Sequence, residues 1–330
     1  MIISRAPFRI TLAGGGTDLP EFYQKHGGSV TSMAIDKYIY VCFKNNLLDE
    51  NIRLQYLKTE YVRHVDELEH DRAKAALKHF GIFKNCEISS MADLPARSGL
   101  GSSGSYLVAL INALQQFKNK NLSKHDIAEL ACKIEMEDLG EPVGKQDQFI
   151  ASYGALQTFD IDREGNVAVK PLDLSTEPLR AFVKRCRIYY TGVQRDASAV
   201  LLSQVANKQN FEDKMLKIRD LGYEFVAALE NQNYDKYGEL LNQHWNYKKR
   251  LSSKMTSPLI DEIYRFLKDE GLILGGKIIG AGGGGFLMVY VPQDFEKVDE
   301  HMKSARFIKL NYDVDNGGVH TIFGKNDLLF

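Results

Sequence analysis

The sequence has no apolar run approaching the roughly 20 residues that a membrane-spanning helix needs. Its first residues, Met-Ile-Ile-Ser-Arg-Ala-Pro-Phe-Arg, put charge and proline where a signal peptide needs an apolar stretch. An excess of one charge is also missing, because 42 Lys and Arg stand against 43 Asp and Glu. The four cysteines are scattered, without the spacing of a zinc site or a disulfide framework. We therefore expect a cytoplasmic protein with no membrane or nucleic-acid partner and no structural metal.

The length and the hydrophobic content of the sequence are sufficient for about two domains. The 330 residues are 44% hydrophobic, so a core can form without disulfides or metals. The first half alternates strand-like and helix-like segments, and this pattern of predicted elements changes after about Pro178. We expect one domain over residues 1–180 and a second over 181–330. The second is predicted as a small mixed α/β unit whose last strands are Lys277–Ile279, Phe286–Val291 and Val319–Phe323.

Two helices of the first half are well marked. Ser102–Phe117 has apolar residues at helical spacing. Ser123 is predicted as the N-cap of the next helix, with Asp126 three residues on, and Gly140 is expected to end it.

A glycine- and serine-rich segment, Pro95-Ala-Arg-Ser-Gly-Leu-Gly-Ser-Ser-Gly104, enters the Ser102–Phe117 helix. Glycines let the backbone approach a phosphate, and N–H groups at a helix start attract anions. The hydroxyls of Ser102 and Ser103 suit phosphate oxygens or Mg²⁺. Gly99–Gly104 also fits G-x-G-x-x-G, but four residues separate it from the preceding strand, whereas a dinucleotide loop follows its strand directly. It lacks the Gly-Lys-Ser/Thr of a Walker A loop, and a simple capped connection stays possible.

Three further segments carry candidate chemistry. Gly144-Lys-Gln-Asp147 follows a helix with Glu135, and two carboxylates could orient a hydroxyl and hold Mg²⁺ in phosphoryl transfer. Gly280–Gly285 has five glycines in six residues, which indicates close approach to a ligand or to the serine-rich segment. In Pro7–Asp18, Arg9 lies within a strand, where a buried charge needs a partner, and a glycine run precedes Asp18.

Together these segments resemble the GHMP kinases, the family of galactokinase, homoserine kinase, mevalonate kinase and phosphomevalonate kinase. The family's three motifs match Pro7–Asp18, Pro95–Gly104 and Lys277–Gly285, in order, and the resemblance covers essentially the whole chain. It implies an α+β fold: an N-terminal domain like domain 2 of ribosomal protein S5 and a ferredoxin-like C-terminal domain. ATP and the acceptor would bind between the two domains.

The resemblance also implies roles for individual residues. Asp147 would be the catalytic aspartate beside the acceptor hydroxyl, and Arg9 the basic residue that keeps it ionised. Ser103 would contact Mg²⁺ with Glu135, which we favour over Glu137 by allowing one inserted residue near Lys145. The ATP phosphates would be wrapped by the loop residues Pro95, Arg97, Ser98, Gly99, Leu100, Gly101, Ser102, Ser103 and Gly104.

Differences from the motifs of individual family members narrow the choice of the sugar that accepts the phosphoryl group. Galactokinases have Glu-His where this chain has Gly15-Gly16, so galactose is not expected. Gly-Gly-Gly-Thr-Asp, Gly-Lys-Gln-Asp and His244–Ser253 resemble most the heptose-7-phosphate 1-kinases and the related fucokinases, which are usually larger. The implied reaction phosphorylates the anomeric hydroxyl of D-glycero-D-manno-heptose 7-phosphate, toward nucleotide-activated heptose for surface polysaccharide. The candidate substrate contacts are Gly15, Gly16, Thr17, Asp18, Gly144, Lys145, Arg195, Lys248, Gly282 and Gly283.

The acceptor's own phosphate would need cations, for which Arg195 and Lys248 are candidates, although basic residues on an amphipathic helix are usually solvated. On the same helix Trp245 is expected in the core, whereas His244 could serve packing or the site. Two other function classes remain as alternatives: a dinucleotide-dependent oxidoreductase, and a family member without catalysis. The presence of Asp147 and of the serine-rich loop argues against the second.

Overall fold

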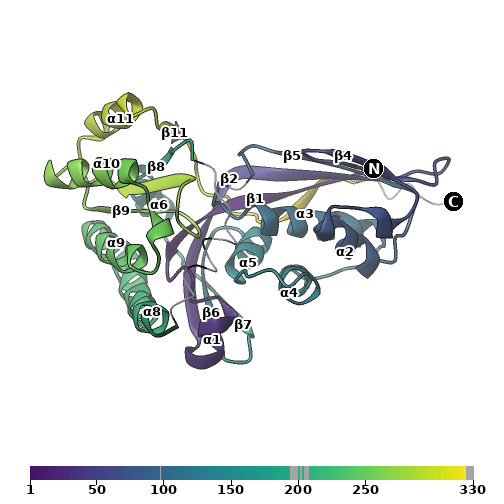
Figure 1. Ribbon diagram of the computed structural model, residues 1–330, viewed down its shortest axis with the longest axis horizontal. Coiled ribbons are helices and arrows are strands. Elements are labelled where there is room, and N and C mark those ends of the chain that lie inside the picture. Colours follow the sequence, from purple (N-terminus) through teal and green to yellow (C-terminus); the bar gives the residue numbers. More distant parts are fainter. Residues whose placement is uncertain (97, 194–199, 201–202, 204–207, 325–330) are drawn as a thin grey trace.

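Two long paired strands run through the N-terminal part of the molecule. The computed structural model describes residues 1–96, 98–193, 200, 203 and 208–324. Strand β1 (Ile2–Ala13) pairs antiparallel with β2 (Gly28–Asn45), which is 18 residues long. Because β2 is so long, its first half pairs with β6 and its second half with β5 (Figure 1). Arg9 lies within β1, as the sequence predicts.

The remaining strands complete an eight-stranded sheet around this pair. Its order is β12-β1-β2-β5-β3-β4, with β6 and β7 attached at the other end of β2. All its pairings are antiparallel except that of β3 with β5. These strands are β3 (Ile52–Gln55), β4 (Thr59–Val62), β5 (Cys86–Ala92), β6 (Leu156–Ile161), β7 (Val167–Pro171) and β12 (His320–Gly324).

Helices cover one face of this sheet. Helix α3 runs over the predicted Ser102–Phe117 and is buried on nearly all sides against β1 and β2. Beside it lie α2, α4 and α5, all on the same side of the sheet in Figure 1. Ser123 caps α4 in a capping box with Asp126, as predicted. The elements are α1 (Pro20–His26), the short η1 (Val65–Glu67), α2 (Asp71–His79), α4 (Lys124–Lys133) and α5 (Gln146–Tyr153).

The helical segment predicted to begin after Ser123 and to end at Gly140 is present, but its last turn is π-helical. The α-helix ends at Lys133 and continues as the π-helical segment η2 (Ile134–Asp138). Its signature is the bond from Leu139 N to Ile134 O at 3.0 Å, between residues five apart. A π-turn holds one more residue than an α-turn.

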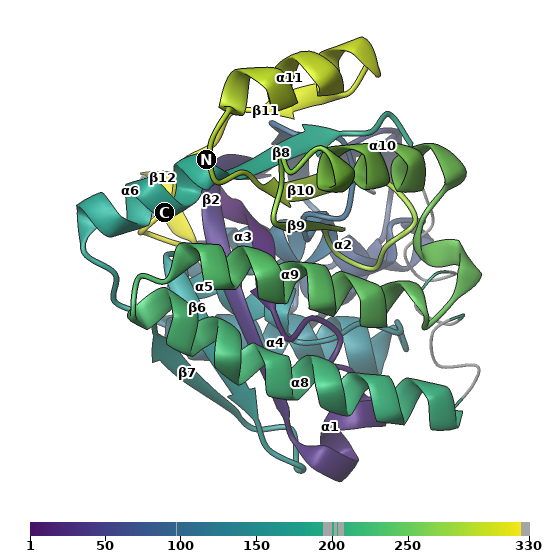
Figure 2. The same ribbon diagram turned by 90° about the vertical axis from the view of Figure 1, so that its left-hand side faces the viewer.

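The C-terminal part is built on a second sheet. It has four antiparallel strands in the order β11-β8-β10-β9. Helices α8 and α9 lie side by side, α9 against β9 and α8 also against β1 and β2 (Figure 2). The elements are α6 (Thr176–Arg185), β8 (Cys186–Tyr190), α8 (Lys208–Glu230), α9 (Tyr234–Lys249), η3 (Ser253–Met255), α10 (Pro258–Asp269), β9 (Gly275–Ile278), β10 (Phe286–Tyr290), α11 (Phe295–Ser304) and β11 (Ile308–Leu310).

The last strand corrects the sequence prediction. The segment predicted as Val319–Phe323 belongs to the first sheet, because β12 pairs with β1 rather than with the C-terminal strands. Asp315, just before β12, anchors the chain on the N-terminal lobe. Its carboxylate accepts a hydrogen bond from Tyr38 Oη at 2.9 Å, and its backbone carbonyl accepts one from Ala155 N. The C-terminal lobe is therefore inserted into the sheet of the N-terminal lobe. The domain boundary near residue 180 stays a prediction.

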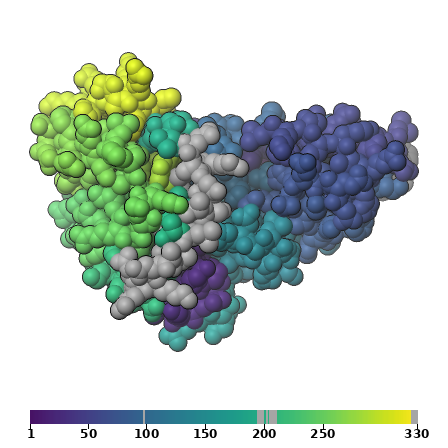
Figure 3. All heavy atoms as spheres, viewed as in Figure 1, coloured from purple at the N-terminus to yellow at the C-terminus, as the bar shows by residue number. Residues whose placement is uncertain are grey.

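A single hydrophobic core connects the two lobes. It includes Phe8 of β1, Leu107 of α3, Phe225 of α8 and Tyr237 of α9, all fully buried. The space-filling view shows α8–α10 in green at one end and the α2 and β3–β5 region in blue at the other (Figure 3). Among the described residues no helix is long and apolar enough to cross a membrane.

Helix α9 approaches β9 closely because two glycines face each other. A Cβ on Gly238 would lie 2.6 Å from Tyr290 Cδ1, and one on Gly275 would lie 2.2 Å from the carbonyl oxygen of Gly238. No larger residue fits at either position without moving the helix from the sheet. This contact fixes how far the side chains of α9 reach toward the N-terminal lobe.

We predict that Gly238→Ala destabilises the protein, because overpacking a filled contact costs about 1–3 kcal/mol. The matched control is Gly222→Ala on α8, where a Cβ meets no atom nearer than 3.8 Å. There alanine removes backbone freedom and should stabilise by up to about 1 kcal/mol. Thermal unfolding of both variants tests this pair, and an unchanged or raised melting temperature for Gly238→Ala would contradict it.

Candidate active site

The start of α3 is open to an anion. Its N-cap is Gly101, with φ of 82°, and no side chain caps the helix or places an acid in the first turn. Ser102 and Ser103 of the first turn line a cavity, and buried Ser98 Oγ has no hydrogen-bond partner in the described structure. Free N–H groups, hydroxyls and bare glycines fit the phosphates of a nucleotide. Arg97 lies outside the described residues, and Pro95 is not among the lining residues.

The glycine run of the C-terminal lobe packs directly on this loop. A Cβ on Gly280 would lie 2.5 Å from the carbonyl oxygen of Gly99, and one on Gly285 would lie 2.1 Å from that of Ser98. The expected close approach is therefore made to the serine-rich loop. Gly280 and Ala281 line the cavity.

Gly282 and Gly283, predicted to contact substrate, lie against η3 instead. Gly283 N donates to Met255 O at 2.8 Å, and a Cβ on Gly282 would lie 2.3 Å from Met255 Cε. Neither glycine is among the residues that line the cavity.

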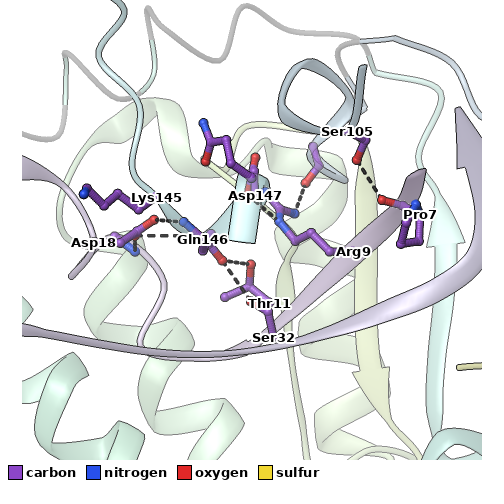
Figure 4. A network of polar contacts seen from close by, with 12 residues as sticks. Pro7, Arg9, Thr11, Asp18, Ser32, Ser105, Lys145, Gln146 and Asp147 are labelled. Atoms are coloured by element: carbon purple, nitrogen blue, oxygen red, sulfur yellow. Dashed lines mark hydrogen bonds and ion pairs between the residues drawn. The ribbon is translucent and has the colours of Figure 1, made fainter. Parts of the chain in front are cut away.

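An ion pair between Arg9 and Asp147 stands at the centre of the site (Figure 4). Arg9 Nε lies 2.7 Å from Asp147 Oδ1, and its Nη1 donates to the carbonyl of Gly99 at 2.7 Å. The backbone of Arg9 also donates to Leu100 O at 3.1 Å. Strand β1, the phosphate loop and the start of α5 are thus joined through one guanidinium. A Cβ on Gly101 would lie 3.2 Å from both side chains.

A second carboxylate, Asp18, faces the cavity beside this pair. Its oxygens accept from Gly16 N and Gln146 N, each at 3.1 Å, and from Gln146 Nε2 at 3.4 Å. Burial raises the pKa of Asp18, and the nearby charge of Asp147 adds to this. Gln146 is held in turn by Thr11 Oγ1 at 2.6 Å. The motif Gly144-Lys-Gln-Asp contains Gln146, but the sequence interpretation gave it no role.

Two predicted substrate contacts are directed elsewhere. Lys145 Nζ donates to Gly165 O at 2.6 Å and lies 3.3 Å from Glu129, on the far side from Asp147. Thr17 Oγ1 donates to Ser29 O at 2.9 Å and is fully buried. Neither residue lines the cavity, so the structure gives both a role in positioning the surrounding backbone.

The C-terminal lobe adds cations to the cavity. Lys248 of α9 donates to the carbonyl of Gly15 at 2.9 Å, and Lys277 of β9 donates to that of Leu12 at 3.2 Å. Burial, together with the charges of Lys248 and Arg9, lowers the pKa of Lys277 well below its usual value. His244 of α9 lines the same cavity. Lys277 lies in a recognised motif, but only the fold shows that its side chain points inward. Arg195 lies outside the described residues.

The lining residues come from both lobes. They are Arg9, Thr11, Gly15, Gly16, Asp18, Leu19, Gly99, Gly101, Ser102, Ser103, Val143, Gly144, Gln146, Asp147, His244, Lys248, Lys277, Ile278, Gly280 and Ala281.

The residues predicted to hold Mg²⁺ fit it only in part. Ser103 lines the cavity, but Glu135 does not. Glu135 is fully buried, with Arg72 Nε at 2.7 Å from one carboxylate oxygen and Gln148 Nε2 at 2.5 Å from the other. The alternative Glu137 is exposed. Mg²⁺ in nucleotide sites is held largely by phosphates and water, so Ser103 could contact it without a cluster of carboxylates.

Comparison with known proteins gives consistent matches over both lobes. The family description "GHMP kinases N terminal domain" matches residues 68–155, and "GHMP kinases C terminal" matches residues 225–307, together more than half of the chain. The D-glycero-alpha-D-manno-heptose 7-phosphate kinase of Campylobacter jejuni is 28% identical, over 88% of this chain and 89% of that protein.

Two further relatives extend the comparison. The L-fucokinase/L-fucose-1-P guanylyltransferase of Bacteroides fragilis is 27% identical over 87% of this chain, but over only 34% of that longer protein. A crystal structure of a D-glycero-D-manno-heptose 1-phosphate kinase from Bacteroides thetaiotaomicron has a TM-score of 0.81 and 23% identity. The match covers 99% of this chain and 100% of that one, and it shows the shared fold.

We predict that Glu135→Gln lowers the melting temperature, because removing one partner of a buried ion pair costs about 3–5 kcal/mol. The Mg²⁺ concentration needed for half-maximal turnover should stay unchanged in this variant, whereas Ser103→Ala should raise it. Mg²⁺ titrations of turnover, with melting curves of the same samples, test both. An equal rise in the two variants would place the ion on Glu135 after all.

Proposed function

The chain belongs to the GHMP kinase family, and from this we propose that it phosphorylates the anomeric hydroxyl of D-glycero-D-manno-heptose 7-phosphate with ATP. A kinase of this family is a phosphotransferase with an alcohol group as acceptor. The product would be the 1,7-bisphosphate, a precursor of nucleotide-activated heptose for surface polysaccharide. The proposal includes dependence on Mg²⁺ and a cytoplasmic location.

The observation that carries the proposal is the position of the Arg9–Asp147 pair. It lies between the open start of α3 and the pocket formed by Asp18 and Gln146. A group that accepts a proton from a hydroxyl has to stand between donor and acceptor, within hydrogen-bond reach of that hydroxyl. The position of Asp147 supports this role, since a Cβ built on Gly101, the N-cap of α3, would lie only 3.2 Å from its carboxylate.

The transfer itself needs positioning and charge more than covalent chemistry. Asp147 would accept the proton of the anomeric hydroxyl while the oxygen of that hydroxyl forms a bond to the γ-phosphorus of ATP. At the same time the bond between the γ-phosphorus and the bridging oxygen breaks, and ADP leaves with that oxygen. Arg9 would hold Asp147 in position through their ion pair and stabilise charge that develops on the phosphoryl oxygens. The N–H groups at the start of α3 and the hydroxyls of Ser102 and Ser103 would hold the phosphates in line. Bound Mg²⁺ would supply further charge neutralisation between the phosphates.

The choice of acceptor rests on likeness and on charge. The Campylobacter jejuni relative is named as a heptose 7-phosphate kinase and matches along nearly all of its own length. The cavity also contains Lys248 and Lys277, which suit an acceptor that brings its own negative charge.

A kinase of an unphosphorylated sugar such as L-fucose is the second candidate. The matching region of the Bacteroides fragilis fucokinase supports it, and Asp18 and Gln146 would read sugar hydroxyls in either case.

We predict that Asp147→Asn retains ATP binding and loses roughly 10²–10⁴-fold in kcat, the usual contribution of a positioned base. Asp173→Asn, at an exposed position, is the matched control and should keep full activity. Single-turnover rates and nucleotide titrations measure the two effects separately. If Asp147→Asn keeps more than half of the normal rate, Asp147 has no part in proton transfer.

The acceptor is tested by a transfer assay over free sugars and sugar phosphates, with ³¹P NMR to locate the new ester. We expect heptose 7-phosphate to be the best acceptor and the new phosphorus signal to be that of an anomeric phosphate. Equal turnover of unphosphorylated heptose, or preference for fucose, would favour the second candidate.

A further inference from the structure

His244 is a buried polar side chain that the protein itself leaves unsatisfied. It is 2% exposed, and neither Nδ1 nor Nε2 has a hydrogen-bond partner within the described ranges. An imidazole carries one donor and one acceptor when neutral, and leaving such groups unpaired in the interior costs about 1–3 kcal/mol. Because the ring lines the same cavity as Asp18 and Gln146, a ligand is the available partner.

The surroundings of His244 indicate the charge of that ligand. Lys248, one turn further along α9, is 4% exposed, and Lys277 on the adjoining strand β9 is 3% exposed. Both ammonium groups are near enough to lower the pKa of the imidazole, in addition to the effect of burial. Two buried cations beside an N–H donor form a site for a dianion with several acceptor oxygens, such as a phosphate monoester.

The contacts of Lys248 distinguish the acceptor end of the cavity from the ATP end. Its Nζ is bonded to the carbonyl of Gly15, and a Cβ on Gly16 would lie 3.2 Å from it. A side chain at Gly16 would compete with the ammonium for this space, and one at Gly15 would meet Thr11 Cγ2 at 2.9 Å. The Gly15-Gly16 pair, which replaces the Glu-His of galactokinases, therefore leaves room for a cation from α9. The start of α3, where ATP phosphates fit, is approached by Arg9 instead.

We propose that His244, Lys248 and Lys277 bind the phosphate group of the sugar acceptor, an assignment that rests on the proposed sugar-phosphate kinase activity. Lys248 and Lys277 supply charge, and His244 donates one N–H to a phosphate oxygen. Specificity for a phosphorylated sugar then comes from α9 and β9 of the C-terminal lobe, whereas Asp18 and Gln146 of the N-terminal lobe contact the sugar.

The test compares His244→Leu, Lys248→Met and Lys277→Met with Lys236→Met, a control at the exposed start of α9. KM values are measured for heptose 7-phosphate, unphosphorylated heptose and ATP. Each of the three variants should raise KM for heptose 7-phosphate roughly 10- to 100-fold, the effect of losing one charge-assisted contact. KM for the unphosphorylated sugar and for ATP should stay at the wild-type value.

His244→Leu has a second readout that a structural role would not give. Because the ring nitrogens have no partner among the residues that the structure describes, replacing them should leave the melting temperature unchanged or raise it. A melting temperature that falls together with a uniform loss on all substrates would assign His244 to packing. A raised KM for ATP in any of the three variants would assign that side chain to the nucleotide.

Inhibition by inorganic phosphate tests the phosphate site independently of which sugar is the substrate. In the wild type it should inhibit competitively against the acceptor and not against ATP, and the three variants should lose this inhibition. If heptose 7-phosphate is no substrate but this inhibition pattern holds, the phosphate site stands and the proposed substrate is wrong. If heptose 7-phosphate is phosphorylated while the variants keep wild-type KM and inhibition, the phosphate site is wrong and the proposed function stands.

Discussion

Direct backbone contact between two glycine-containing loops is the constraint on which the site depends. Gly280 lies on Gly99 and Gly285 on Ser98 at distances that no Cβ could occupy. A larger residue at either position would push the C-terminal lobe away from the start of α3. The loop that fits phosphates, the carboxylate of Asp147 and the lysines of α9 and β9 then could not line one cavity. Gly280–Gly285 has five glycines in six residues, and glycines lose much conformational entropy on folding. This backbone contact explains why glycines stand there.

Three basic side chains from the two lobes meet in the cavity. Arg9 pairs with Asp147, Lys248 donates to the carbonyl of Gly15, and Lys277 donates to that of Leu12. Burial raises the pKa of Asp18 and lowers that of Lys277, so the charged form of each is disfavoured in the free protein. Such an arrangement is costly in the free protein and is relieved when anions enter.

The sequence predicted those parts of the site that depend on local chemistry. The helix Ser102–Phe117, the cap at Ser123 and the need of Arg9 for a partner follow from spacing and charge, and all are present. The prediction that Lys145 contacts the substrate rested on its closeness to Asp147 in the sequence. The side chains of residues 145 and 147, at the start of α5, point in different directions. The π-turn could not be read from Ile134–Asp138 either, since its composition suits an α-helix equally well. The roles of His244 and Lys277 depend on how α9 packs on β9, which only the tertiary structure determines.

The return of β12 to the first sheet has a consequence for the order of folding. Strand β1 is made first during synthesis, yet one of its two neighbours is His320–Gly324, more than 300 residues away. Until that segment leaves the ribosome, β1 has an open edge that can pair with other chains. Such distant pairings close slowly and extend the time during which a nascent chain can aggregate. The first residues of β1, Ile2–Arg5, therefore gain this second neighbour only after residues 320–324 have been made.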